Sequence, residues 1–323
     1  MSLSRKLGAF VALIAFVGSV LAQAAYPARS VTLINPYPPG GLADATARQL
    51  GIRLSILWKQ PVIVDTRPGA TGNLAATLVV GAPADGHTLL FTIPEALSIT
   101  KASGASVGFD AAADLEPVAL VALSSTVLVV NANSPIKSFA DFMAYAKANP
   151  GKANFGSQGQ GSSFHLALEE LKALSGADIV HVPYKGAAAA LTDLMAGRID
   201  AMIATTTLAA PNVKSGKLRA IAVTSGERLS QFEGVPTVRE SGFPRFEYPV
   251  GLGVFVRTGT PAALVERLNA DIRKVMHDPS FVELLTQSAS TTTDLTAAAF
   301  QKRWAQETEG YRQLIQKSKI RFD

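Results

Sequence analysis

The chain contains no cysteine, only two tryptophans and only four histidines, and 17% of its residues are charged. The absence of cysteine excludes disulfide bonds, thiolate metal sites, a cysteine nucleophile and a lipid-modified cysteine behind a signal segment. No paired metal-ligand spacing relates the four histidines, which are His87, His165, His181 and His277. The formal net charge of +5 is mild, and no basic run marks a nucleic-acid partner. We therefore expect no metal, no cofactor and no nucleic acid.

The start of the chain has a different composition from the rest. Two basic residues precede an apolar run at 7–21, and small residues follow at Ala22 and Ala24. This order is typical of a cleavable secretory signal, whereas a membrane-spanning helix needs about 20 apolar residues. We predict that residues 1–24 are a signal peptide and that the mature protein is exported without a lipid anchor. In a Gram-negative bacterium its compartment would be the periplasm.

Short apolar runs alternate with segments of helical periodicity along the remaining chain. This alternation is typical of an α/β protein with largely parallel sheets. A strand at 30–36 is followed by a helix at 42–58, in which apolar residues recur every three or four positions. Further strands are predicted at 61–65, 88–93, 153–155, 179–182, 199–204 and 218–224. Further helices are predicted at 72–80, 139–147, 164–174, 187–195, 263–276 and 297–318.

Two segments are interpreted as crossings between lobes. The run of small and β-branched residues at 118–131 is longer than a usual strand, and we interpret it as a passage into a second lobe. The run at 250–256 is then the return crossing. No linker of low complexity separates the two halves. We therefore predict two α/β lobes, the first made of 25–123 together with 247–323 and the second made of 124–246.

Four glycine-rich loops follow predicted strands and precede predicted helices, at 36–41, 67–73, 156–163 and 182–186. We call them the four glycine loops. The carboxyl ends of strands in open α/β sheets border the crevice where ligands bind. A helix start offers free N–H groups and a partial positive charge, which suit an anion. A turn and a helix cap would explain any one loop, but two such loops in each lobe favour a hinged clamp for an anion.

Known catalytic motifs are not found. The segment 156–161 has the glycine spacing of a phosphate loop, but Ser162 stands where that loop requires lysine. No G-x-G-x-x-G follows the first strand, and no G-x-S-x-G elbow occurs. Glu169 and Glu170 are expected to face solvent. His165 lies one turn into a helix behind a glycine loop, where contact with a ligand and a structural role are both open. We therefore do not expect an enzyme.

Eight segments in order resemble the Bug receptors, the periplasmic binding proteins of tripartite tricarboxylate transporters. They include Tyr37-Pro-Pro-Gly-Gly-Leu-Ala-Asp44 and His181-Val-Pro-Tyr-Lys-Gly186, together with 65–73, 83–90, 148–152, 156–166, 215–225 and 235–238. The resemblance covers essentially the whole mature chain. It implies a periplasmic binding protein-like fold of type II, a "Venus flytrap" of two α/β lobes around a ligand cleft. It also implies that the protein captures a carboxylate and delivers it to an integral membrane permease. We expect the protein to be a monomer.

The resemblance also implies which residues contact the ligand. In the first lobe these would be Tyr37, Pro39, Gly40, Gly41, Gly72, Asn73 and Thr92. In the second lobe they would be Ser157, Gly159, Ser162, His165, Tyr184, Lys185, Gly186, Ala204 and Thr205.

Two departures from the family pattern bear on the ligand. Ala204 stands where members that bind amino acids have an aspartate, so an ammonium group would lack a partner and we expect a ligand without a free amine. Ile93 and Pro94 would make one wall more apolar, which suits an aliphatic or aromatic mono- or dicarboxylate. Glu95 would be costly at an anion site unless it points away or accepts a ligand hydroxyl, and both options are open.

Two other functions remain alternatives. One is a secreted hydrolase or lyase that uses His165 or Glu95. The other is a ligand-sensing module that signals to a membrane partner instead of feeding a permease. A receptor differs from a hydrolase or lyase because it returns its ligand unchanged. It differs from a sensing module because it feeds a permease, so uptake of the acid should fail when the permease is deleted.

Overall fold

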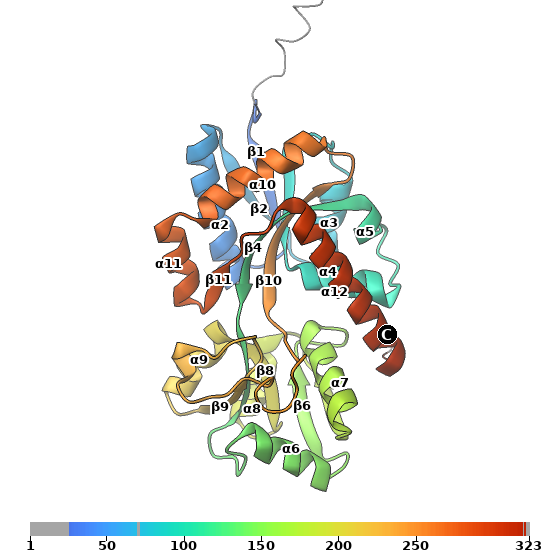
Figure 1. Cartoon of the computed structure of the whole chain (residues 1–323), viewed down its shortest axis with the longest axis vertical. Coiled ribbons are helices and arrows are strands. Elements are labelled where there is room, and N and C mark those ends of the chain that lie inside the picture. The colour runs from blue at the N-terminus through green and yellow to red at the C-terminus, as the bar shows by residue number, and fades with distance from the viewer. Residues whose placement is uncertain (1–25, 70–71, 319, 321–323) are drawn as a thin grey trace, which may run out of the picture.

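The computed structural model describes residues 26–69, 72–318 and 320, and the predicted signal peptide lies outside this part of the chain. Two sheets lie one above the other along the long axis of the molecule (Figure 1). We call the parts of the chain built on them the first and the second lobe.

The first sheet has six strands in the order β11-β4-β10-β3-β1-β2. Its strands are β1 (Val31–Asn35), β2 (Val62–Thr66), β3 (Thr88–Thr92), β4 (Leu115–Ser124), β10 (Val250–Arg257) and β11 (Ser290–Thr292). Its helices are α2 (Leu42–Trp58), α3 (Asn73–Val80), α4 (Pro94–Ser103), α5 (Ala111–Asp114), α10 (Ala262–Met276), α11 (Pro279–Gln287) and α12 (Ala297–Ser318).

Both faces of the inner strands of the first sheet are buried. Val31 and Leu33 of β1 pack in a cluster with α2, α10 and α11, whereas Ile34 packs on the other face with α3, α4 and α12. Successive side chains of a strand point to opposite faces, so a strand covered on both sides is apolar throughout. This explains why the strands appear in the sequence as continuous apolar runs.

The second sheet has five strands in the order β7-β6-β8-β5-β9. They are β5 (Thr126–Asn131), β6 (Ala153–Ser157), β7 (Ile179–Pro183), β8 (Ala201–Thr205) and β9 (Leu218–Val223). One face packs on α6 (Phe139–Ala148) and α7 (Ser163–Ser175), and the other on α8 (Ala187–Met195) and α9 (Thr206–Lys214).

The long apolar run at 118–131 contains two strands that belong to different sheets. β4 ends at Ser124 in the first sheet and β5 begins at Thr126 in the second, so only Ser125 separates them. The chain returns through Tyr248 and enters β10 at Val250. Figure 1 shows β4 and β10 side by side between the two lobes, and they run in opposite directions.

The sheets are mixed, so the prediction of largely parallel sheets was wrong. β10 runs antiparallel to β3 and β4, and β5 runs antiparallel to β8 and β9. The crossing strands run against their neighbours because the chain must leave the first lobe and come back to it. Parallel pairing is kept among β1, β2 and β3, and among β6, β7 and β8.

The strand directions place the carboxyl ends of both parallel sets toward the opposite lobe. β3 and β4 share a direction because both are antiparallel to β10, and β4 leads into the second lobe. β1 and β2 run parallel to β3, so the loops after all three strands face the second lobe. β8 runs against β5, which enters from the first lobe, so the loops after β6, β7 and β8 face the first lobe.

Helix α12 connects the two lobes. It packs along β4 and α4 of the first lobe, and near its end Ile315 forms a buried cluster with Ile99 of α4 and Leu166 of α7 (Figure 1). α4 follows β3 directly, and α7 begins at the third glycine loop. Helices that start at loops of opposite lobes therefore touch within two turns of their starts.

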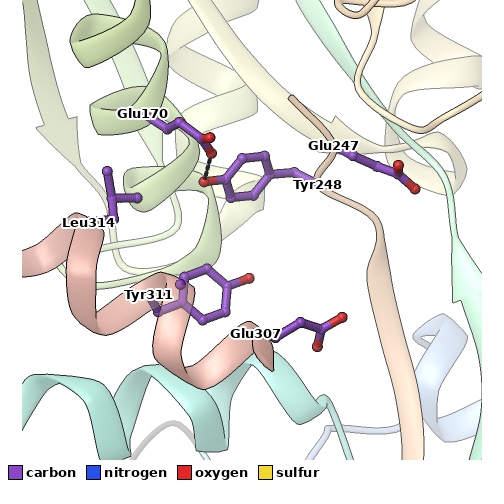
Figure 2. Close-up of a pocket in the computed structure, with 7 residues that line it drawn as sticks. Glu170, Glu247, Tyr248, Glu307, Tyr311 and Leu314 are labelled. Carbon is purple, nitrogen blue, oxygen red and sulfur yellow. Dashed lines mark hydrogen bonds between the residues drawn. The ribbon is translucent and has the colours of Figure 1, made fainter. Parts of the chain in front are cut away.

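An acidic pocket lies beside this contact (Figure 2). Its volume is about 230 Å³, and it is lined by Glu170, Glu247, Tyr248, Glu307, Gly310, Tyr311 and Leu314. The Tyr248 hydroxyl donates a hydrogen bond to Glu170 of α7, which ties the crossing segment to the second lobe. Three carboxylates in its wall make this pocket unsuited to an anion, and none of the four glycine loops lines it.

Candidate ligand-binding site

Tyr37 joins the first glycine loop to the end of β3. Its hydroxyl lies 3.2 Å from the Thr92 Oγ1 and accepts a hydrogen bond from the Ile93 N–H at 3.0 Å. Burial raises the pKa of Tyr37 to about 12, so the phenol stays neutral at physiological pH. The loops after β1 and β3 are therefore held together by an uncharged group.

The start of α2 carries its own acid. Asp44, which is buried, accepts the Gly40 N–H at 3.3 Å and forms an ion pair with Arg48 at 3.0 Å. Burial acts to raise the pKa of Asp44, but the bonds from Arg48, Gly40 and Asn35 outweigh it and hold the pKa below its usual value. The Gly40 N–H is thus already engaged, whereas Pro39 and Gly41 are exposed at the helix start.

Gly72 lets the second glycine loop come close to the loop after β1 and to the end of β3. Its φ is +95°, and a Cβ built on it would lie 3.5 Å from the Pro36 ring and 3.8 Å from the Thr92 Oγ1. Residues with a Cβ rarely adopt this φ. Asn73 follows as the first residue of α3, with its Oδ1 3.5 Å from the Thr100 Oγ1 of α4. The structure thus brings Tyr37, Gly72 and Thr92 of the predicted first-lobe residues together.

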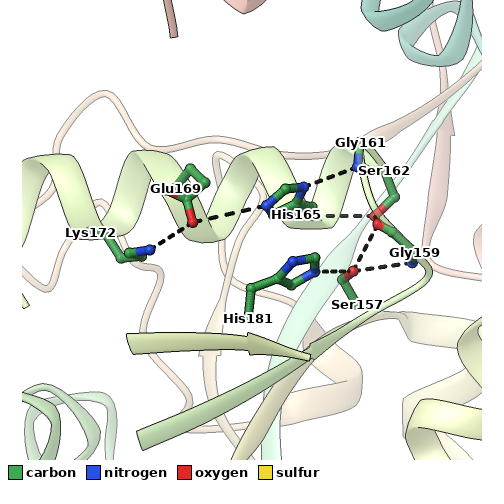
Figure 3. A network of polar contacts seen from close by, with 8 residues as sticks. All are labelled: Ser157, Gly159, Gly161, Ser162, His165, Glu169, Lys172 and His181. Carbon is green, nitrogen blue, oxygen red and sulfur yellow. Dashed lines mark hydrogen bonds and ion pairs between the residues drawn. The ribbon is translucent and has the colours of Figure 1, made fainter. Parts of the chain in front are cut away.

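The third glycine loop is closed by its own side chains (Figure 3). The Ser157 Oγ, which is fully buried, accepts the Gly159 N–H at 3.1 Å and lies 2.6 Å from the His181 Nε2. The Ser162 hydroxyl donates to the Gly159 carbonyl at 2.8 Å and accepts the His165 N–H at 3.3 Å as the N-cap of α7. Ser157 and Ser162 therefore hold the loop and its helix start in place.

Two histidines stack behind this loop. The rings of His165 and His181 are parallel within 6°, with centroids 3.7 Å apart. The His165 Nδ1 accepts the Gly161 N–H at 3.0 Å (Figure 3). Burial lowers the pKa of both histidines to about 4, so both are neutral at physiological pH. His165 is only 4% exposed and has a structural role in this structure.

The expectation that Glu169 and Glu170 face solvent was wrong, because both are partly buried. The Glu169 carboxylate binds the Lys172 Nζ at 2.8 Å, and Glu170 accepts the Tyr248 hydroxyl. Glu170 faces the crossing segment of the chain, which lies far away in the sequence, and helical periodicity alone could not show this.

The fourth glycine loop is tied to the third through the backbone. The Tyr184 N–H donates to the Ser157 carbonyl at 3.1 Å, whereas the Tyr184 hydroxyl binds Asp193 of α8 at 2.8 Å. Lys185 is exposed beside it, and Gly186, with a φ of +106°, precedes α8 without a side-chain cap. Lys185 therefore brings a positive charge to an uncapped helix start.

Ala204 and Thr205 differ in their placement. Ala204 is fully buried in the apolar cluster under α8 and α9, whereas Thr205 is partly exposed at the start of α9 without a side-chain cap. No carboxylate occupies this strand end. Within the described residues, no hydrogen bond joins a predicted site residue of one lobe to one of the other.

Of the two options for Glu95, the structure has the one in which it points away from the loops. Glu95 is 5% exposed, and its Oε1 accepts the Gly251 N–H of β10 at 2.9 Å, while its buried Oε2 has no partner. Burial, and then the nearby Glu307, raise the pKa of Glu95 to about 7. Glu95 therefore faces the crossing strand.

No group of three or more side chains suited to hold a metal ion occurs in the part of the chain that the structure describes. Over the same residues, each helix is too short or too polar to cross a membrane.

A family model described as the tripartite tricarboxylate transporter family receptor matches residues 46–320. The chain belongs to this family. A relative from Pseudomonas sp. (strain P51), described as the UPF0065 protein in the tcbD-tcbE intergenic region, is 38% identical over 314 residues, or 96% of this chain and 93% of that protein. The protein BugT of Bordetella pertussis is 34% identical over 286 residues, or 88% of this chain and 87% of BugT. The resemblance to the Bug receptors is confirmed.

Solved structures of this receptor family have the same fold. Rpa4515 of R. palustris with adipate has a TM-score of 0.80 at 31% identity, over 91% of this chain and 99% of that one. MatC of Rhodopseudomonas palustris with bound malate has a TM-score of 0.77 at 27% identity, over 90% of this chain and 100% of that one. The predicted two-lobed α/β fold of the periplasmic binding protein type is confirmed.

Proposed function

We propose that this receptor captures a small organic carboxylate between its lobes in the periplasm and presents it to the membrane subunits of a tripartite tricarboxylate transporter. The observation that carries the proposal is the arrangement of the strand ends. The loops after β1, β2 and β3 face the second lobe, and those after β6, β7 and β8 face the first. Uncapped helix starts at Gly41, Gly72 and Gly186 thus turn N–H groups toward the region between the lobes.

The charges of these loops suit an anion. Asp44, the acid in the first turn of α2, is neutralised by Arg48, and Lys185 adds an exposed positive side chain on the second lobe. Because related receptors were solved with adipate and with malate, we propose a mono- or dicarboxylate of about four to six carbons.

We also propose that the ligand leaves unchanged. The two residues that a hydrolase or lyase would have used are His165 and Glu95, which are 4% and 5% exposed. His165 is engaged with the Gly161 N–H and Glu95 with the Gly251 N–H. A general acid or base must reach the proton that it transfers. Both side chains are buried and already hydrogen-bonded to backbone N–H groups, so neither is available to a ligand between the lobes.

A panel of mono- and dicarboxylates that includes adipate, succinate and malate tests this function. A cognate acid at one hundred times its dissociation constant should raise the free energy of unfolding by about 2.7 kcal/mol in a thermal-shift assay. Calorimetry should then give one site per chain, and the recovered acid should be chemically identical to the acid added. The proposal fails if no acid in the panel stabilises the protein, or if the bound acid is converted.

The same assay tests whether a free amine is rejected. L-Aspartate should bind at least tenfold more weakly than malate, which carries a hydroxyl in place of the ammonium group. Ala204 is buried and Thr205 offers only a hydroxyl, so an ammonium group would lose its hydration without gaining a carboxylate partner. Sub-micromolar binding of aspartate or glutamate in calorimetry would overturn this prediction.

A further inference from the structure

The stacked histidines hold the third glycine loop at two points. Through the Ser157 Oγ, His181 connects to the Gly159 N–H, because the His181 Nε2 and that N–H lie 2.6 Å and 3.1 Å from the same oxygen. Through its own Nδ1, His165 accepts the Gly161 N–H at 3.0 Å. Two of the glycines of this loop are thus oriented from behind by imidazoles (Figure 3).

Glycines leave a loop without local restraint unless something outside the loop fixes them. Gly159 has a φ of +134° and Gly161 a φ of +71°. Glycine adopts these conformations at no steric cost, but it can also adopt many others. The parallel packing of the two rings, 3.7 Å apart, joins α7 and β7 and stops either ring from turning independently. The stacked rings therefore restrain the backbone of the third glycine loop, which its glycine-rich sequence leaves flexible.

The hydrogen bond to Gly161 also fixes the tautomer of His165. An N–H can donate only to an unprotonated nitrogen, so the His165 Nδ1 carries no hydrogen and the proton of the neutral ring is on Nε2. The His165 Nε2 lies 3.9 Å from the Glu169 Oε1, which the Lys172 Nζ binds at 2.8 Å. The charged groups that face the stack are therefore Glu169 and Lys172 of α7.

We propose that His165 and His181 act together as positioning residues, whose neutral, stacked rings hold the third glycine loop in its ligand-binding geometry. This inference rests on the proposed function for its ligand, but the role of the stack in the loop can be tested separately. Ser157, His165 and His181 then do not touch the ligand themselves, and instead set the direction of the backbone at Gly159 and Gly161.

Acid should undo this arrangement. A proton added to His165 goes to Nδ1, where it opposes the Gly161 N–H and removes the hydrogen bond. The pKa of both rings in the folded protein is about 4, below the ordinary 6.5, so the folded state binds fewer protons than the unfolded chain. Stabilisation by the neutral pair is therefore complete above pH 6.5 and is lost as the pH falls to about 4.

Three variants separate positioning from simple packing. In His165→Leu the ring is replaced by an apolar side chain that cannot accept a hydrogen bond. The affinity for adipate or malate at pH 7.5 should then fall about tenfold, as expected for the loss of one hydrogen bond from the partly buried Gly161 N–H. In His165→Asn an oxygen stands near the place of Nδ1, so most of the lost affinity should return. The double variant His165→Asn/His181→Gln should show a weaker loss of affinity from pH 7.5 to pH 3.5, where the rings of the wild type are mostly protonated, than the wild type. Titration of the acid itself affects both proteins equally.

The exposed His277, which caps the C-terminal end of α10, provides the matched control as His277→Gln, because it lies on the first lobe. It should keep the affinity and the pH profile of the wild type. Equal affinity in the wild type and in His165→Leu, or an unchanged pH profile in the double variant, would overturn the inference. If the wild type bound no carboxylate at all, the proposed function would fail instead.

Nuclear magnetic resonance tests the loop without a ligand. The ring signals of His165 and His181 should stay constant from pH 7.5 to pH 5.5, and the His165 Nδ1 should have the chemical shift of an acceptor nitrogen. The amide signals of Gly159 and Gly161 should broaden or move in His165→Leu and return in His165→Asn. Protonation of the His165 Nδ1 at neutral pH would refute the positioning role. The same holds if the Gly159 and Gly161 amide signals are unchanged in both His165→Leu and His165→Asn.

Discussion

Replacing Glu95 with glutamine is expected to stabilise the protein by about 2 kcal/mol at pH 8. Glu95 is 5% exposed, and only one of its two oxygens has a hydrogen-bond partner, the Gly251 N–H. A pKa raised from 4.5 to about 7 corresponds to about 3 kcal/mol lost on ionising the buried group. Glutamine keeps an acceptor for Gly251 but places an unpaired NH2 at the second position, which returns about 1 kcal/mol of the gain.

The pH dependence follows from the direction of the shift. The pKa of Glu95 is higher in the folded protein than in the unfolded chain, so its stabilising effect is complete below pH 4.5 and is lost as the pH rises through about 7. Urea denaturation followed by tryptophan fluorescence should therefore find Glu95→Gln more stable than the wild type at pH 8 and about equal at pH 5.5. The exposed Glu233→Gln serves as the control and should match the wild type at both pH values. A destabilised Glu95→Gln at pH 8, or a gain that does not depend on pH, would contradict the assignment.

Helices with a regular apolar face were predictable from the sequence. The bounds predicted for α8 and α12 are those of the structure, and α2 was predicted at 42–58 as observed. In α2 the buried residues Ala47, Leu50 and Leu54 recur at spacings of three and four, which is the pattern that one buried face requires. The local sequence is therefore sufficient to predict a helix that packs on a sheet with only one of its own faces.

Helices with prolines or with polar buried residues were missed. α4 begins at Pro94 and buries Glu95 and Ser98, so its sequence lacks an apolar face even though β10 and α12 cover it. α9 contains Pro211 in its interior, and α11 opens at Pro279. Proline is a breaker signal in a sequence, but at a helix start its fixed φ is compatible with the helix. Tertiary packing, which the sequence does not show, decided these cases.

The same limit applies to the candidate site. Glycine, proline and serine content located the loops, because turn chemistry is local. It could not tell which side chains hold a loop and which are open to a ligand. Ser157 and Tyr184 stay predicted ligand contacts, but the sequence did not show the partners of their side chains: the Ser157 Oγ is buried against His181, and the Tyr184 hydroxyl binds Asp193. The partner of His165 is His181, on a neighbouring element, and neither spacing nor periodicity relates the two.

Substituting alanine for Gly253 in the crossing strand β10 is expected to destabilise the protein by about 2 kcal/mol or more. A Cβ at this position would lie 2.9 Å from the Pro94 Cγ, 3.1 Å from the Phe300 Cζ and 3.2 Å from the Phe255 Cε2. All three atoms belong to rings in the buried layer between β10, α4 and α12, so they cannot turn aside as the end of a flexible chain could. Overpacking a well-packed core in this way costs about 1–3 kcal/mol.

Gly310 of α12 offers the same substitution in open surroundings. Nothing lies within 4 Å of a Cβ built on it, and it stands inside a helix, where alanine is preferred over glycine by about 0.5–1 kcal/mol. Gly310→Ala should therefore raise the urea midpoint while Gly253→Ala lowers it, although the two proteins differ from the wild type by the same methyl group. If Gly253→Ala were as stable as the wild type, the crossing strand would not be locked against α4 and α12. The Glu95–Gly251 contact, two residues along the same strand, would then need to be reconsidered as well.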